Sequence, residues 1–79
     1  MTPRIVGPTE VRPYDKHVYE LLNDAAGGTW TVSEPKLARI TAQTATKCMV
    51  EIIASKASKT GFTISCGSHV LEIPKILSL

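Results

Sequence analysis

Two cysteines and two histidines are the side chains of this sequence best suited to nucleophilic chemistry. Cys48 or Cys66 would act as the nucleophile, with His17 or His69 as its base. That chemistry requires an exposed thiol of lowered pKa beside a histidine. Both cysteines instead fall on the predicted inner faces of strands, where cysteine behaves as a small hydrophobic residue. His69 falls in a predicted turn, so we expect no catalytic residue.

The spacing of polar residues also does not indicate a metal site, a pair of catalytic carboxylates or a phosphate-binding loop. Neither cysteine belongs to a Cys-x-x-Cys pair, and neither histidine is at metal-ligand spacing from them. The acidic residues are expected either in turns or on outer faces of strands: Asp15, Asp24, Glu34, Glu20, Glu51 and Glu72. Gly27 and Gly28 precede a predicted strand rather than a helix, so no phosphate loop is expected. The sequence predicts no metal site, no cofactor and a protein that is not an enzyme.

A disulfide between Cys48 and Cys66 stays open from the sequence. The two residues are expected near the same end of two facing strands, and a bridge there would add about 3 kcal/mol. It would require Cα atoms within about 6.8 Å. In a reducing compartment free thiols are expected instead.

Composition and charge restrict the class of protein. The 79 residues are 43% hydrophobic and 20% charged, with a net charge of +2. This length predicts a single domain over residues 1–79 with a thin core. Charges of both signs alternate without the basic stripe of a nucleic-acid-binding domain.

No apolar run reaches the ~20 residues that cross a bilayer, and residues 1–10 lack the apolar core of a signal peptide. We therefore expect a soluble protein without membrane insertion, and no nucleic-acid partner.

Short alternating apolar segments separated by Gly, Pro, Asn, Asp and Ser predict an all-β domain. We expect seven strands, at about residues 4–6, 17–22, 29–33, 38–43, 47–54, 61–66 and 70–77. The first would resume over residues 9–12 after a kink at Gly7-Pro8. Residues 15–26 also fit a helix, since Val18, Leu21, Leu22 and Ala25 have helical spacing. The strand-rich surroundings favour a strand there.

The order of several short motifs resembles the bacterial immunoglobulin-like domains of the second group. These motifs are Ile5-Val6-Gly7-Pro8, Tyr19-Glu20-Leu21, Gly28-Thr29-Trp30-Thr31-Val32-Ser33, Ala38-Arg39-Ile40 and Lys59-Thr60-Gly61-Phe62-Thr63-Ile64-Ser65. The resemblance implies an immunoglobulin-like β-sandwich of about seven strands. It also implies a structural or adhesive role, in a phage virion as a capsid or tail decoration or, if the chain is a fragment of a larger protein, at the bacterial cell surface. Pro74 departs from the family pattern, because it interrupts the expected last strand.

A sandwich of this kind closes two facing sheets around the tryptophan of its third strand. The expected structural core is Trp30, Val32, Ile40, Val50, Ile52, Phe62, Ile64, Leu71 and Ile73, with Leu21 and either Val18 or Tyr19. Apolar residues expected outside this core form a possible interaction surface: Met49, Ile76, Leu77 and Leu79. We expect protein partners there. The alternative is a carbohydrate-binding module for a cell-surface glycan, which would need exposed aromatic side chains.

Overall fold

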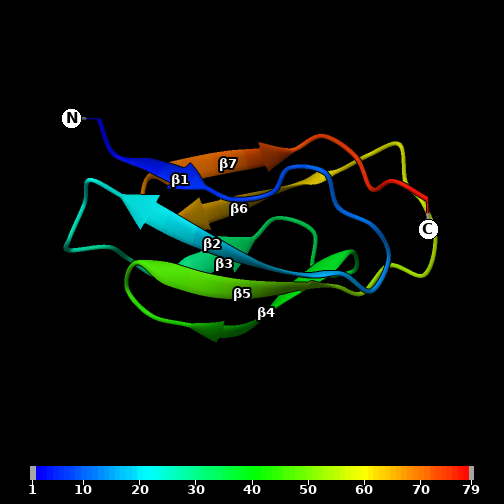
Figure 1. The fold of residues 1–79 in the computed structure, drawn as a ribbon, viewed down its shortest axis with the longest axis horizontal. Coiled ribbons are helices and arrows are strands. Elements are labelled where there is room, and N and C mark those ends of the chain that lie inside the picture. Colours follow the sequence, from blue (N-terminus) through cyan, green and yellow to red (C-terminus); the bar gives the residue numbers. More distant parts are fainter. Residues whose placement is uncertain (1, 79) are drawn as a thin grey trace.

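Seven strands make up the fold in the computed structural model, which describes residues 2–78 and contains no helix within them (Figure 1). The strands are β1 (Arg4–Val6), β2 (Lys16–Leu22), β3 (Trp30–Val32), β4 (Ala38–Gln43), β5 (Lys47–Ile52), β6 (Phe62–Cys66) and β7 (His69–Ile73). Over the same residues there is accordingly no helix of the length and hydropathy that would cross a membrane.

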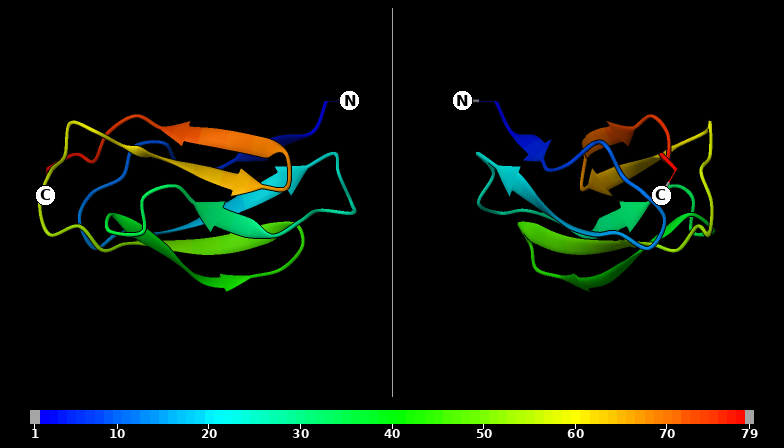
Figure 2. Two further views of the ribbon diagram at one scale, coloured as in Figure 1. Left: turned by 180° about the vertical axis from the view of Figure 1, so that it is seen from behind. Right: turned by 45° about the vertical axis from the view of Figure 1, so that its right-hand side comes forward.

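The strands form two antiparallel sheets that pack face to face. One sheet has the strand order β1-β2-β5-β4 and the other has the order β3-β6-β7. The three strands of the second sheet lie side by side in the view from behind (Figure 2). With the strands lettered A to G along the chain, these sheets are A-B-E-D and C-F-G. That arrangement is the constant-type immunoglobulin topology. The predicted all-β sandwich of about seven strands is therefore confirmed.

Strand β2 resolves the two interpretations of residues 15–26 in favour of a strand. It pairs with β1 on one side and with β5 on the other. Tyr19 and Leu21 point into the core, whereas Val18 beside them is 53% exposed. The helical spacing of the apolar residues was thus misleading, because this alternation has period 2. Of the two alternatives for the core, the structure places Tyr19 inside and Val18 outside.

The segment that follows β1 and the segment that follows β7 lie side by side at one end of the sandwich (Figure 1). After Gly7-Pro8 the chain does not form the expected second strand, and only Val11 makes a bridge, which is parallel to Ile76. The last strand ends at Ile73, before Pro74, rather than continuing to residue 77. Proline lacks an amide hydrogen and cannot continue the ladder. Beyond it, the Leu77 amide donates to the Val11 carbonyl at 2.8 Å, which ties the N-terminal and C-terminal segments together.

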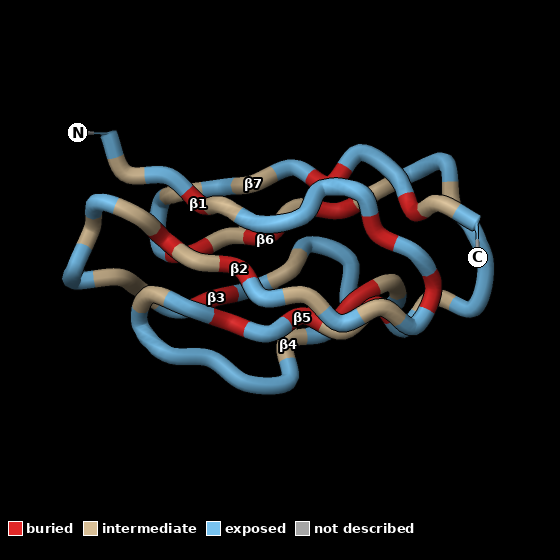
Figure 3. Tube along the Cα trace, viewed as in Figure 1, coloured by how far each residue is buried: buried red, intermediate tan, exposed pale blue. Residues whose placement is uncertain are grey.

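Buried positions alternate with exposed ones along the strands of both sheets (Figure 3). Among the residues expected in the core, Trp30, Val50, Ile52, Phe62, Ile64 and Ile73 are buried, and Val32, Ile40 and Leu71 are partly buried against them. Leu21, Cys48 and Cys66 are also buried in the core, as expected. The core further contains Tyr19, one of the two alternatives, and residues that the pattern did not place there: Ile5, Val11, Ala38 and Ile76. No charged side chain is buried between residues 2 and 78.

Candidate interaction surface

The two cysteines are buried as free thiols in the core. Burial, followed by the neighbouring Cys66, raises the pKa of Cys48 to about 11. Burial and then Asp24 also raise the pKa of Cys66, whose Sγ lies 3.6 Å from the carbonyl oxygen of Ala45. Reactive thiols need the opposite shift, together with access to solvent. Both cysteines therefore serve as core residues in this structure.

Each histidine lies beside one aspartate on the surface. The Nε2 atom of His17 is 3.2 Å from Asp15 Oδ2, within one loop and the start of β2. His69 begins β7 rather than lying in a turn, and its Nε2 is 3.2 Å from Oδ2 of Asp24. The second pair links the β2–β3 loop to the start of β7. Within residues 2–78 no three His, Cys, Asp or Glu side chains gather closely enough to hold a metal ion.

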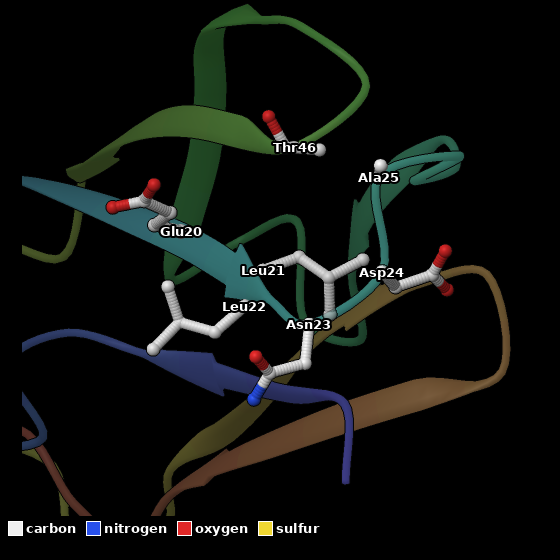
Figure 4. A pocket seen from close by; sticks show the side chains of 7 residues that line it. All are labelled: Glu20, Leu21, Leu22, Asn23, Asp24, Ala25 and Thr46. Carbon is white, nitrogen blue, oxygen red and sulfur yellow. The ribbon is translucent and has the colours of Figure 1, made fainter. Parts of the chain in front are cut away.

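A hollow lies at one end of β2, beside the loop between β4 and β5. Its volume is about 500 Å³, and it is lined by Glu20, Leu21, Leu22, Asn23, Asp24, Ala25 and Thr46. Figure 4 shows that the carboxylates of Glu20 and Asp24 lie at opposite ends of it and point in different directions. Acid–base chemistry needs two groups that converge on one reacting bond. This hollow offers no such convergence.

The outer face of β2, β5 and β4 carries a row of apolar side chains. In the cross-strand register Val18 lies opposite Met49, and Met49 lies opposite Ala42. Val18 is 53% exposed and Met49 38% exposed. These residues line a second hollow of about 220 Å³ on this face. We call Val18, Met49 and Ala42 the apolar row.

Charged residues border the apolar row on both sides. On one side Lys16 lies opposite Glu51, which in turn lies opposite Arg39. The Arg39 Nε and Nη2 atoms contact Oε1 of Glu51 at 2.8 and 2.7 Å. On the other side Glu20 lies opposite Lys47. An apolar centre within a polar rim is the usual anatomy of a protein–protein interface.

A β-bulge in β4 determines which side chains reach this face. The register shifts between Ile40 and Ala42, so that Thr41 is left out of the register, although its Oγ1 donates to the Met49 carbonyl at 3.4 Å. Without the shift Ala42 would face the core, as Ala38 and Ile40 do. With it, Ala42 joins the apolar row and Gln43 faces inward toward β3.

The expected interaction surface is only partly present in the structure. Met49 lies at the centre of the apolar row, as expected for an outward-facing residue. Ile76 was wrongly expected outside the core: it is 1% exposed, and it exchanges backbone hydrogen bonds of 2.9 and 3.0 Å with Ser58. Pro74 ends the strand and lets the chain turn back over Val11, which buries Ile76. Leu77 is partly buried at this edge, and Leu79 lies outside the described residues.

Val18 was left as an alternative to Tyr19 for the core and was not assigned to the surface, and its alignment with Met49 was not predicted. The available signal was the alternation along β2, since a buried Tyr19 requires an outward Val18. The alignment of β2 with β5 has no comparable local signal. It depends on the register between strands separated by two other strands in the chain.

Aromatic side chains do not form a platform on the described surface. Tyr19, Trp30 and Phe62 are buried, whereas Tyr14 is 62% exposed. Carbohydrate-binding and single-stranded nucleic-acid-binding surfaces use several exposed aromatic rings together. A lone tyrosine lends little support to either kind of ligand.

Fold and surface together define the class of this protein: an immunoglobulin-type β-sandwich that exposes an apolar row on one sheet. No family model matches the chain, and no curated protein or solved structure matches it with significant similarity.

Proposed function

We propose that this protein is a non-catalytic immunoglobulin-like module that binds a protein partner through the outer face of β2, β5 and β4. The observation that carries the proposal is the apolar row, in which Val18 and Met49 are exposed inside a border of charged residues. Exposing these side chains to water is unfavourable, and covering them with a partner stabilises the complex. The buried, unreactive thiols support a binding role over a catalytic one.

The proposed setting is an assembly in a phage virion, as a capsid or tail decoration, or a bacterial cell surface. Its support is the resemblance of the Trp30 and Ile40 strand motifs to bacterial immunoglobulin-like domains of the second group, together with the observed strand order. A rigid sandwich presents one face of a sheet in a constant orientation, which suits such assemblies. The carbohydrate-binding alternative has less support, because Tyr14 is the one strongly exposed aromatic residue in the described chain.

The proposal is tested by photo-crosslinking in the protein's natural setting. A photoreactive residue replaces Met49 on the proposed face, and a matched variant carries it at Glu72, which is exposed on β7 in the other sheet. We expect one defined protein adduct from position 49 and none of comparable yield from position 72. Equal labelling from both positions, or no adduct from position 49, would overturn the proposed binding face.

A further inference from the structure

The charges on either side of the apolar row are opposite in sign on each of two strands. On β2, Lys16 lies on one side of Val18 and Glu20 on the other. On β5 the order is reversed, so that Glu51 lies beside Lys16 and Lys47 lies beside Glu20. A rotation by 180° about the apolar row therefore exchanges a positive residue with a negative one on both strands.

This pattern makes the face complementary to itself about a two-fold axis that runs along the apolar row. A two-fold axis along the apolar row would place β2 over β2 of a second copy, in the opposite direction. Lys16 would then face Glu20 of the second copy, and Glu51 would face its Lys47. Because a two-fold interface repeats each contact, there would be four such pairings.

A two-fold axis parallel to the strands and over β5 would instead place Lys47 over Lys47 and Glu51 over Glu51, which is repulsive. An axis parallel to the strands but between β2 and β5 would place Lys16 over Glu51 and Glu20 over Lys47. In that arrangement residue 47 faces Glu20 and residue 51 faces Lys16, so a mixture of Lys47→Glu and Glu51→Lys variants would recover no affinity.

We propose that this protein forms a symmetric dimer through the β2–β5–β4 face, with the two-fold axis along the apolar row. This inference rests on the proposed binding face and names a second copy of the chain as its occupant. At the centre Met49 lies next to Met49 of the second copy, beside Val18 and the hollow of about 220 Å³. Methionine is flexible and fills irregular spaces of this kind well.

The expected affinity of the dimer follows from the area of the β2–β5–β4 face. Three strands at a spacing of ~4.8 Å, each about six residues long at ~3.4 Å per residue, give a planar footprint of roughly 300 Å². Even with the roughness of side chains this lies below the ~800 Å² per partner of a stable interface. We therefore expect a weak dimer, with a dissociation constant of about 0.1–1 mM, which forms where many copies are held close together.

A charge-exchange experiment tests both the face and the orientation. Lys47→Glu alone brings a new carboxylate over Glu51 of the second copy, and Glu51→Lys alone brings a new ammonium group over its Lys47. In an equimolar mixture, however, the carboxylate introduced in one variant faces the ammonium group introduced in the other. The unchanged Glu51 of the first variant then faces the unchanged Lys47 of the second.

The two variants should therefore behave differently alone and together. We expect each variant alone to dimerise about tenfold more weakly than the wild type, which is ~1.4 kcal/mol. The mixture should recover most of the wild-type affinity as a heterodimer, because every pairing across its interface is again between opposite charges.

Sedimentation equilibrium and NMR diffusion measurements up to about 2 mM protein provide the readout, with Glu72→Lys as a control on the other sheet. Far-UV circular dichroism verifies that every variant is folded, since Glu51→Lys also removes the contact with Arg39. A wild type that stays monomeric at 2 mM, or a mixture no tighter than its components, overturns the dimer. In either case a photo-crosslink from position 49 to a different protein would still support the proposed function. Failure of the dimer can therefore be distinguished from failure of the proposed binding face.

Discussion

The side chain of Gln43 lies along the backbone of Trp30 and hydrogen-bonds to both of its peptide groups. Its Oε1 accepts from the Trp30 amide at 3.0 Å, and its Nε2 donates to the Trp30 carbonyl at 3.4 Å. Gln43 ends β4 in one sheet and Trp30 begins β3 in the other. The carboxamide thus occupies the place of a neighbouring strand at the open edge of β3, and it joins the two sheets there. Covering an exposed edge also protects it from pairing with other chains.

Replacing Gln43 with alanine should lower the free energy of unfolding by about 1 kcal/mol, because two hydrogen bonds at a solvent-accessible edge are lost. Gln43→Glu keeps the acceptor for the Trp30 amide but loses the donor, so its effect should be smaller near neutral pH. Urea denaturation followed by circular dichroism measures both. An unfolding midpoint of Gln43→Ala equal to that of the wild type would show that water replaces the side chain fully.

Replacing Trp30 with alanine should cost about 3–5 kcal/mol, because it empties a large volume in the core. The ring is 2% exposed, and its Nε1 donates to the Thr44 carbonyl at 2.9 Å. Trp30→Phe keeps most of the apolar volume and loses this hydrogen bond, so we expect roughly half the cost or less. Circular dichroism is the suitable readout, since both variants lack the tryptophan fluorophore. Equal destabilisation by the two replacements would argue against volume as the main cause.

Replacing Gly7 with alanine should destabilise the protein, because the ring of Tyr19 lies against its α-carbon. A Cβ atom at Gly7 would lie 2.3 Å from Cδ1 of Tyr19, and the Tyr19 hydroxyl is anchored to the Pro8 carbonyl at 2.6 Å. We expect a cost of about 2–3 kcal/mol from overpacking. Gly67→Ala is the matched control: its φ is +62°, but nothing lies within 4 Å of the added Cβ.

A double-mutant cycle separates this clash from backbone strain at Gly7. In a Tyr19→Ala background the ring is absent, so the cost of Gly7→Ala should fall by at least about 1 kcal/mol. The same cost in both backgrounds would mean that the backbone conformation, rather than contact with Tyr19, excludes alanine.

Alkaline pH should destabilise the protein through its buried Tyr19 and cysteines, with Tyr19 and Cys48 shifted most. Burial, followed by Cys48 and Asp15, raises the pKa of Tyr19 from 10.0 to about 12, and the pKa of Cys48 is raised from 9.0 to about 11. Below pH 9 both groups are protonated in the folded and unfolded states, and their contribution to stability is complete. As the pH rises further, the unfolded chain releases protons that the folded protein retains. The free energy of unfolding should therefore fall progressively between about pH 9 and 12.

Urea denaturation under reducing conditions at about pH 7, 9, 10 and 11 measures this dependence. The Tyr19→Phe variant is the control, because it removes the phenol and should decline less steeply above about pH 10. A stability that stays constant from about pH 8 to 11 would contradict the raised pKa values.

The alternation of apolar residues was sufficient to predict much of the fold. Along β5 and β6, Cys48, Val50, Phe62 and Ile64 alternate with polar or exposed neighbours, and a period of two specifies both the strand and its inward face. Trp30 could be placed in the core because burying its ring dominates the local energetics. Pro74 correctly signalled a disturbance in the last strand, since it cannot donate a ladder hydrogen bond.

The features that only the tertiary structure decided depend on contacts between segments that are distant in the chain. Ile76 is buried because the chain after Pro74 returns to Val11, and nothing in its immediate neighbours indicates this pairing. Ala42 reaches the outer face, and Gln43 reaches Trp30, because of the bulge at Thr41. The apolar row and its opposed charges exist only in the register of β2 with β5 and β4. By itself the sequence determined which residues favour a strand and a buried face, since those preferences are local. Strand register and edge contacts were decided by the packed fold, because their energies involve residues that are far apart in the chain.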